Sequence, residues 1–385
     1  MKLIETPGLH IKSWCDEPEA GAIEQAKNIA QLPFAHQHIA LMPDTHQGYG
    51  MPIGGVLAAV DTIIPNAVGV DIGCGMLACK TTLQDIRQGE IRKIMGLVRE
   101  SIPTGFHHRK TPLTIKAPPK NAPIVQAEHQ SAQHQVGTLG GGNHFIEIQR
   151  GSDGHIWFMI HSGSRNLGKK VCDHYNALAK RLHARWPGAV PAKWDLAFLP
   201  IDTEEGQQYI AEMEYCQQFA AENRRVMFDD ILGAFEKVIP GAAVCDGESA
   251  INVHHNYARL EHHFGKDVWV HRKGATSAQE GEMGIIPGSQ GTKSYIVTGL
   301  GNQDSFCSCS HGAGRKMGRK EAQRTLSLEA EIAHMDKQGI VHGIRNKRDL
   351  DEAAGAYKDI DVVMEEQKDL VEIAVELTPL GVIKA

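Results

Sequence analysis

Between residues 37 and 80, the apolar residues come in short runs that glycine and proline interrupt. The runs read HIALM, GGVLAAV and AVGV, and each is typical of a buried strand. Similar short apolar stretches at 145–148, 155–160, 267–271 and 294–300 predict further strands. Strands in this number favour a fold built on β-sheet.

Helical spacing of apolar residues appears in other parts of the chain. The clearest stretch is 204–238, and shorter ones occur at 19–32, 320–336 and 360–370. Residues 105–135 are polar and contain proline, which predicts a long surface excursion that could touch a substrate. Together these patterns predict a mixed α/β (α+β) fold with a single domain over 1–385, in which 204–238 could form a helical subdomain.

Composition excludes some classes of protein. The 385 residues are 42% hydrophobic and carry a net charge of −6, so any nucleic-acid contact must come from local patches. The eight cysteines show no compact framework spacing and the N-terminus lacks an apolar signal region, which predicts a cytoplasmic protein. No stretch approaches the ~20 apolar residues that span a bilayer, and we expect no membrane insertion.

Five residues of types that bind divalent transition metals lie beside glycine-rich turns or at the ends of apolar stretches. They are Asp71, Cys74, His144, His161 and His255. Asp71 and Cys74 can offer a hard oxygen and a soft sulfur ligand from one loop. Any one of the histidines alone is more often a core or surface group than a ligand. The combination favours a metal site, and a thiolate can bridge two ions.

A second cluster, residues 307–315, reads CSCSHGAGR. Its glycines let backbone N–H groups converge on an anion, Arg315 can neutralise that anion, and His311 is placed to act on it. The alternative, a glycine-rich turn between a strand and a helix that begins near Lys316, is at least as frequent for such a segment. Cys307 and Cys309 fit alternating side chains on a strand better than a redox or metal pair.

A third turn, residues 284–291 (GIIPGSQG), is rich in backbone donors and could wrap a nucleotide. It lacks the Lys-Ser/Thr pair of a P-loop, and the chain has no strand-coupled G-x-G-x-x-G with a downstream acid, so neither standard phosphate site is expected. Basic residues concentrate at Arg315, Lys316, Arg319 and Lys320, directly beside the second cluster. We expect this group to touch an acidic substrate.

The motifs, taken in order along almost the whole chain, resemble the RtcB-type RNA ligases. The motifs that carry the resemblance are Met42-Pro43-Asp44-x-His46, Val68 to Gly75, Gly137 to Glu147, His161 to Arg165, His255-Asn256, Pro287-Gly288-Ser289, Ser310 to Arg315, and Ala356 to Asp359 with Lys384. Several have five or more residues, which makes the resemblance specific.

The resemblance implies a GTP- and Mn²⁺-dependent ligase that joins RNA 3′-phosphate or 2′,3′-cyclic phosphate ends to 5′-hydroxyl ends, in tRNA splicing or RNA repair. It implies that Cys74 bridges two Mn²⁺ ions, one completed by Asp71 and His144 and the other by His161 and His255. It also implies that His311 attacks the α-phosphorus of GTP. The residues implied to hold the guanylate are Asn143, His144, Phe145, Ile146, Glu147, His255, Asn256, Pro287, Gly288, Ser289, Gln290, Ser294, His311, Gly312, Ala313, Gly314 and Lys384. The ligand types alone would accept Zn²⁺, Co²⁺ or Mn²⁺, so manganese is implied by the resemblance only.

The chain departs from the usual family pattern at three positions. It has Gly318 where serine is usual, Gln290 where methionine is usual, and Lys384-Ala385 where Lys-Gly is usual. These departures indicate a divergent branch. Two other functions stay open: a metal-dependent RNA 3′-end phosphodiesterase or capping enzyme without efficient sealing, and a metal- or RNA-binding protein with a decayed site. The intact metal and histidine set argues against decay. The resemblance implies RNA as partner and allows an activator such as archease.

Overall fold

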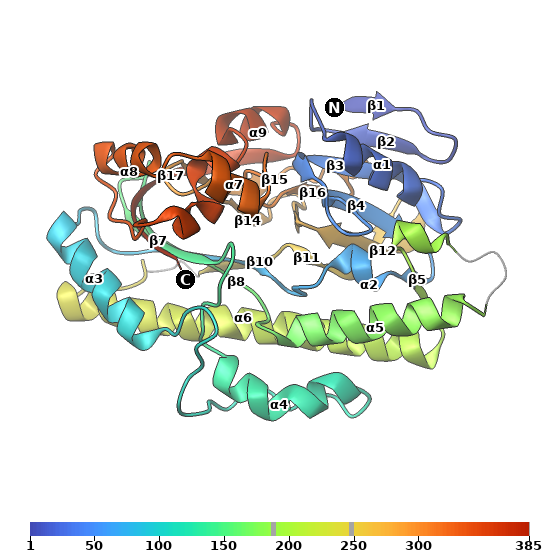
Figure 1. Ribbon diagram of the computed structural model, residues 1–385, viewed down its shortest axis with the longest axis horizontal. Coiled ribbons are helices and arrows are strands. Elements are labelled where there is room, and N and C mark those ends of the chain that lie inside the picture. Colours follow the sequence, from blue (N-terminus) through green and yellow to red (C-terminus); the bar gives the residue numbers. More distant parts are fainter. Residues whose placement is uncertain (186–189, 246–249, 385) are drawn as a thin grey trace.

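Two sheets of unequal size organise the computed structural model, which describes residues 1–185, 190–245 and 250–384 (Figure 1). The six-stranded sheet has the order β1 (Lys2–Ile4), β2 (His10–Ser13), β3 (Ala35–His46), β4 (Ile53–Ala59), β12 (Lys266–Lys273) and β11 (Asn256–His263). Strands β2 and β3 are parallel, and the other neighbours in this sheet are antiparallel. Helix α1 (Ala20–Ile29) connects β2 to β3 and packs on this sheet.

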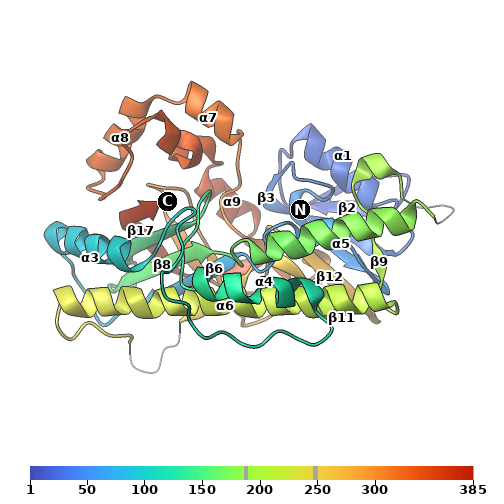
Figure 2. The ribbon, with the colours of Figure 1, turned by 60° about the horizontal axis from the view of Figure 1, so that its bottom comes forward.

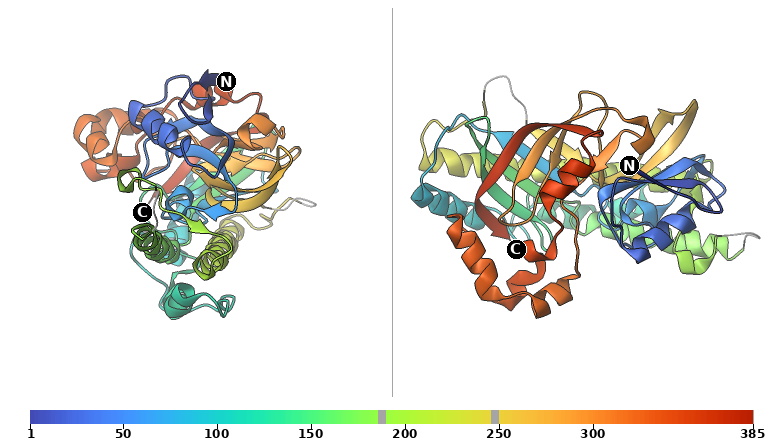
Figure 3. Two further views of the ribbon diagram at one scale, coloured as in Figure 1. Left: turned by 90° about the vertical axis from the view of Figure 1, so that its right-hand side faces the viewer. Right: turned by 90° about the horizontal axis from the view of Figure 1, so that it is seen from above.

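The seven-stranded sheet is antiparallel and carries most of the candidate site. Its order is β10 (Ile251–His254), β6 (Gly75–Lys80), β8 (Ile156–Ser162), β7 (Phe145–Gly151), β17 (Val371–Lys384), β15 (Ser294–Gly299) and β14 (Met283–Ile286). The sheet curls so strongly that its edge strands β10 and β14 contact each other. Figure 3 shows this curvature from above. Two small ladders accompany the sheets: β13 (Ala275–Ser277) with β16 (Ser308–Ser310), and β5 (Thr62–Ile63) with β9 (Leu199–Pro200).

Helix α6 (Glu204–Val238) runs along one side of the molecule beneath the sheets (Figures 1 and 2). Its N-cap is Thr203, whose hydroxyl accepts a hydrogen bond from the Gly206 amide at 3.1 Å. α3 (Gln88–Ser101), α4 (Pro123–Gln135) and α5 (Leu167–His183) pack against it. It also contacts β6, β8 and β10, and its buried Met227, Ile231 and Phe235 join the core under the seven-stranded sheet.

The remaining helices are short. They are α2 (Pro65–Val68), α7 (Arg319–Thr325), α8 (Leu328–Lys337) and α9 (Ile360–Glu366), with 3-10 turns η1 (Ala192–Trp194), η2 (Gln303–Ser305), η3 (Lys347–Glu352) and η4 (Ala354–Ala356). In the described ranges no helix is both long and apolar enough to cross a membrane.

The predicted mixed α/β class is confirmed, and so are the helix at 204–238 and the strands expected from 145–148, 155–160, 267–271 and 294–300. Three expectations were wrong in detail. AVGV is not a strand, because Pro65 at a helix start begins the short helix α2. The excursion 105–135 ends in a helix, α4. The single helix expected over 320–336 is two, because Ser327 caps α8 by accepting a hydrogen bond from the Ala330 amide.

Candidate active site

Sheet register brings the five candidate metal ligands to one end of the seven-stranded sheet. Gly75, the first residue of β6, pairs with Ser162 on β8 and with His254 on β10. Cys74, His161 and His255 are the chain neighbours of these three residues, so the pairing gathers them. His144 directly precedes β7, which pairs with β8 so that Phe145 lies opposite His161. The turn before β6 supplies Asp71.

The ligand atoms form two overlapping groups that share Cys74. One group is Cys74, His161 and His255, and the other is Asp71, Cys74 and His144; within each group the atoms lie within 4.8 Å of one another. The Cys74 Sγ atom lies 3.5 Å from His144 Nε2 and 3.4 Å from His161 Nε2. His161 Nε2 lies 3.4 Å from His255 Nε2, and His144 Nε2 lies 3.3 Å from the Asp71 carboxylate.

Hydrogen bonds behind the rings set which nitrogens face the cluster. His144 Nδ1 donates to the Leu139 carbonyl at 2.8 Å, and His161 Nδ1 donates to the Asn143 carbonyl at 3.0 Å. In the neutral rings, both Nε2 atoms therefore carry lone pairs that point into the cluster. One thiol proton cannot satisfy several converging lone pairs. This set of metal-ligand atoms therefore fits a bound cation. Because Cys74 belongs to both groups, it fits two cations that share its sulfur.

Burial controls the protonation of the cluster. Burial, together with the nearby histidine charges, lowers the pKa of His161 and of His255 well below the ordinary value, so both rings are neutral and able to bind metal. Burial, with the charge of Asp71, raises the pKa of the Cys74 thiol well above its usual value. A divalent cation reverses that effect because it stabilises the thiolate. Burial opposes ionisation of Asp71, but a hydrogen bond and charge from His144 in its protonated form, together with the charge of Arg165, lower the pKa of this carboxyl to about 2 in the metal-free site.

Two positions next to the cluster have strict steric requirements. A Cβ atom at Gly163 would lie 2.2 Å from the Asp71 carboxylate, so a side chain there would displace a candidate ligand. Arg224 on α6 is 0% exposed and donates to the Gly73 and Ser162 carbonyls at 3.1 and 2.8 Å. These carbonyls flank Cys74 and His161. Arg224 therefore fixes the backbone that presents both residues.

His311 lies beside this cluster, after β16. Its ring centroid is 4.8 Å from that of His255. His311 Nδ1 lies 2.5 Å from the carboxylate of Asp44, a fully buried residue of β3, and the same carboxylate accepts the His311 amide at 3.2 Å. His311 Nδ1 faces this carboxylate, and a proton on Nδ1 leaves the lone pair of the neutral ring on Nε2, as a nucleophile requires. The motif Met42 to His46 contains Asp44, but no local sequence pattern indicates its contact with His311, 267 positions further along the chain.

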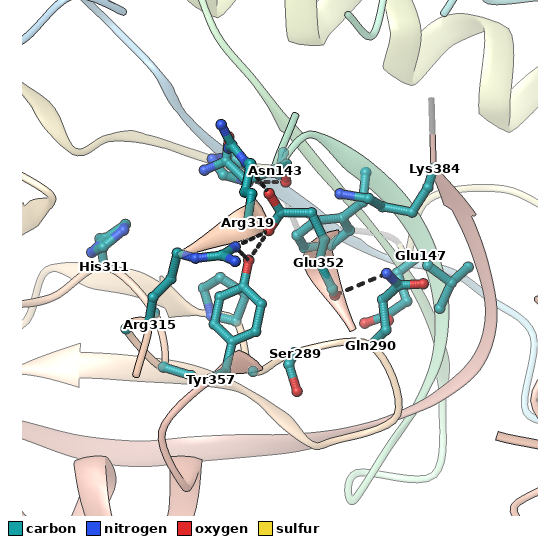
Figure 4. A pocket seen from close by; sticks show the side chains of 18 of the residues that line it. Asn143, Glu147, Ser289, Gln290, His311, Arg315, Arg319, Glu352, Tyr357 and Lys384 are labelled. Carbon is teal, nitrogen blue, oxygen red and sulfur yellow. Dashed lines mark hydrogen bonds and ion pairs between the residues drawn. The ribbon is translucent and has the colours of Figure 1, made fainter. Parts of the chain in front are cut away.

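A pocket adjoins His311, and Figure 4 shows its lining side chains. The predicted residues that line it are Asn143, Phe145, Glu147, Pro287, Gly288, Ser289, Gln290, His311, Gly312, Ala313, Gly314 and Lys384. Five other residues predicted to hold the nucleotide lie outside the lining. His144 and His255 belong to the cluster. Ile146 packs in the core beneath the sheet, Ser294 Oγ accepts the Gly288 amide at 3.2 Å, and Asn256 bonds to Gly274 and the Asp71 carbonyl.

One wall of the pocket is a charged network around Glu352, a residue that sequence reasoning missed. Glu352 is 2% exposed and contacts Arg315 at 2.7 Å, Arg319 at 2.6 Å and the Tyr357 hydroxyl. Arg315 also stacks over the Tyr357 ring at 5.0 Å. The network holds the two guanidinium groups at the pocket wall (Figure 4). Lys316 and Lys320, the other members of the predicted basic cluster, are exposed.

The far end of the pocket carries two ionisable groups: Glu147, which is buried, and Lys384, which is partly exposed. Burial raises the pKa of the Glu147 carboxyl to about 8, and burial lowers the pKa of the Lys384 ammonium to about 8. Lys384, at the end of β17, donates to the Gly142 carbonyl at 2.6 Å. Both side chains can therefore exchange protons near neutral pH and offer hydrogen bonds to a polar ring.

The three departures from the family pattern occupy different settings. Gln290 donates from Nε2 to the Glu352 carbonyl at 3.0 Å, which ties the 287–290 turn to the charged wall. Gly318 is the N-cap of α7, and a Cβ atom there would meet nothing within 4 Å. A serine at this position would therefore fit without a clash. Ala385 lies outside the described residues.

Comparison with known proteins gives a consistent result over the whole length. The family model for tRNA-splicing ligase RtcB matches residues 25–124 and 116–385. RNA-splicing ligase RtcB from Escherichia coli K12 is 38% identical over 414 aligned positions, which cover 100% of this chain and 99% of that protein. The RNA-splicing ligase RtcB of Mycobacterium tuberculosis is 31% identical, with 94% and 100% covered, and the tRNA-splicing ligase RtcB of Thermococcus kodakarensis is 30% identical, with 94% and 90% covered. The chain therefore belongs to the RtcB family of tRNA-splicing ligases.

Proposed function

We propose that this chain uses GTP and Mn²⁺ to join RNA 3′-phosphate or 2′,3′-cyclic phosphate ends to 5′-hydroxyl ends. Membership of the family makes the chain an RNA-splicing ligase. The observation that supports this mechanism best is the position of His311, between the ligand cluster and the pocket, with its Nδ1 facing the carboxylate of buried Asp44.

In this proposal the two ligand groups hold the metal ions. Asp71, Cys74 and His144 would hold one ion, and Cys74, His161 and His255 would hold the other. When bound, the ions neutralise charge on the transferring phosphoryl oxygens and align attacker with leaving group. Arg224 keeps the turn that carries Cys74 in place, and the carbonyls of Leu139 and Asn143 keep the imidazoles oriented.

The pocket would hold the guanylate. Glu147 and Lys384 at its far end suit the polar edge of a purine, Phe145 offers a ring beside it, and the backbone of 312–314 faces the phosphate side next to His311. Ser294 and Asn256 would not contact the nucleotide directly. Ser294 holds the 287–290 turn, and Asn256 holds the turn at Asp71. Ile146 would support the pocket from the core.

The reaction then follows three bond exchanges. His311 Nε2 attacks the α-phosphorus of GTP, an N–P bond forms, and pyrophosphate leaves. An oxygen of the RNA 3′-phosphate attacks the same phosphorus, which frees His311 and leaves GMP on the RNA end. The RNA 5′-hydroxyl attacks the 3′-phosphate, GMP leaves, and a 3′–5′ phosphodiester remains. A cyclic phosphate would first be opened by water to a 3′-phosphate.

We also propose that residues 1–385 form one ligase domain. Helix α6 packs on both α5 and the seven-stranded sheet and supplies Arg224 to the site, which argues against an independent subdomain at 204–238. RNA is the partner that the activity requires, and an archease-like activator is compatible with it.

The test is retention of label from α-labelled GTP on denatured protein, with and without Mn²⁺. We expect metal-dependent label on the native chain, no label on His311→Ala, and normal label on His174→Ala, which changes an exposed histidine of α5. Metal content of His311→Ala should stay near normal. An unlabelled, metal-replete native protein would contradict the mechanism, and a product that stops at hydrolysed or guanylated 3′-ends would favour a phosphodiesterase or capping enzyme.

A further inference from the structure

Phe106 is the most exposed large apolar residue in the described part of the chain, with an exposed fraction of 102%. It lies in a tight turn in which the His107 amide donates to the Thr104 carbonyl at 3.1 Å. Gly105 in this turn has φ +61°, a conformation that glycine adopts without strain. Single exposed apolar side chains are ordinary on protein surfaces. Phe106 is distinguished by its turn, which backbone hydrogen bonds fasten to the loop that precedes the candidate ligand His144.

The turn is fastened to the loop that carries the candidate ligand His144. The Gly105 amide donates to the Gly140 carbonyl at 2.9 Å, and the Leu139 amide donates to the Pro103 carbonyl at 2.9 Å. Arg165 bridges the same two places, because its guanidinium lies 3.4 Å from the Gly105 carbonyl and 3.4 Å from His144 Nδ1. One guanidinium group therefore separates the backbone next to Phe106 from the ligand cluster.

A second anchor holds the segment on its other side. Arg109 donates to the Val136 and Gly137 carbonyls at 3.1 and 3.0 Å and pairs with Asp230 of α6. The Arg109 amide also bonds to the His134 carbonyl. Figure 2 shows this segment between α3 and α4 as the cyan-to-teal trace that passes in front of α6. Phe106, His107 and His108 are exposed between two fixed points.

We propose that Phe106 is a stacking platform for a nucleobase of the RNA strand that enters the metal site, within three nucleotides of the ligation junction. The proposal rests on the ligase function proposed above. Aromatic rings stack on single-stranded bases without demanding a particular sequence, which suits a ligase that must read ends. The exposed neighbours His107, His108 and Lys110 are polar or basic. A single ring among such residues suits a phosphate-flanked base better than the contiguous apolar patch of a protein partner.

The direct test is fluorescence of 2-aminopurine placed singly at each of the three nucleotides on either side of the junction, in short single strands with a 3′-phosphate or a 5′-hydroxyl. With native protein and Mn²⁺, we expect quenching at one or more positions. Phe106→Ala should lose that quenching and weaken RNA binding by about tenfold. Phe106→Trp should restore both, because tryptophan keeps the stacking surface.

Three controls separate this inference from the ligase function and from folding. Leu260→Ala, which changes an exposed apolar residue of β11, should bind RNA like the native chain. Phe106→Ala should retain as much label from α-labelled GTP as the native chain. If the native chain itself retains no label, the ligase mechanism fails, and that result is distinct from a failure of the stacking proposal. An abasic nucleotide at the quenched position should abolish the difference between native and Phe106→Ala. Equal quenching in the native chain and Phe106→Ala would overturn the proposal, and so would an RNA-binding defect of Phe106→Ala that persists with abasic RNA. If Phe106→Ala is defective only in its activation by an added protein, the stacking proposal is wrong and Phe106 is a protein-docking residue.

Discussion

At the scale of single residues, burial sets the protonation state of the groups in the site. The rings of His161 and His255 stay neutral, and Glu147 holds a proton at neutral pH, because charge is costly away from water. Asp44 is the buried carboxylate that contacts His311. Each state suits the task proposed for the residue: a neutral ligand, a hydrogen-bonding carboxyl group, and an orienting acceptor.

If the Asp44 carboxylate sets the His311 tautomer, Asp44→Asn should slow guanylylation by about 100-fold or more, because an amide can also donate to Nδ1 and so favour the ring with its lone pair there and its proton on Nε2. The measurement is the single-turnover rate of label transfer from α-labelled GTP. Metal content should be unchanged, since Asp44 lies outside the ligand groups. Asp304→Asn, which removes a half-exposed carboxylate paired with Lys12, serves as the control. A native rate in Asp44→Asn would mean that Asp44 does not set the tautomer.

Glu147→Gln should change how stability depends on pH. Because the pKa of this carboxyl is raised from 4.5 to about 8 in the folded protein, the native state keeps a proton that the unfolded chain releases between these pH values. The native chain therefore loses stability as pH rises through this window, whereas glutamine cannot ionise. In metal-free protein, urea unfolding at pH 5 and pH 8.5 should show the variant gaining roughly 3–5 kcal/mol relative to native between the two. A constant difference between the two proteins would show that Glu147 ionises normally.

At the scale of elements, helix α6 and strand β17 position the site in different ways. α6 was predictable because 35 residues with helical spacing leave little alternative. β17 lies centrally between β7 and β15 yet contains Pro379, at a place where its register with β7 shifts. A proline within an apolar run argues against a central strand, because proline has no backbone N–H to donate to the neighbouring strand. The position of Lys384 over the pocket was therefore not readable from local pattern.

Arg224→Leu should destabilise the protein by about 3–5 kcal/mol and lower its metal affinity. The substitution removes the donor to the buried carbonyls of Gly73 and Ser162 beside the cluster and leaves them without a hydrogen bond. Urea unfolding and titration of metal-free protein with Mn²⁺ would measure the two effects. The neighbouring Arg225→Leu is the matched control. Arg225 is half-exposed and pairs with Glu222 and Asp229 on the helix surface, so its loss should cost no more than about 1 kcal/mol. Equal effects of the two changes would remove the role assigned to Arg224.

At the scale of the whole molecule, the candidate ligands come from three distant parts of the chain: 71–74, 144–161 and 255. Two ions that share Cys74 and are held by these residues would together link the strands β6, β8 and β10 and the turn before β7. Metal binding should therefore stabilise the global fold and not only a loop.

Mn²⁺ should raise the thermal unfolding midpoint of metal-free protein, by the equivalent of about 2.7 kcal/mol at a hundredfold excess over the dissociation constant. Cys74→Ser should abolish most of this gain, because the shared thiolate is lost from both groups. Cys172→Ala, which changes a buried cysteine of α5 outside the cluster, should lower the midpoint but keep the gain. Equal gains in both variants would place the stabilising ion elsewhere.

The sequence by itself determined the mixed α/β class, the long helix and the identity of the five residues that converge as candidate ligands, because these rest on local periodicity and on residue chemistry. Only the tertiary structure decided that Asp44 contacts His311, that Glu352 holds Arg315 and Arg319, and that Lys384 lies over the pocket. It also decided that Ile146 and Ser294 lie behind the pocket lining. Such contacts join residues up to hundreds of positions apart, and strand register, which no local pattern encodes, sets which of them meet.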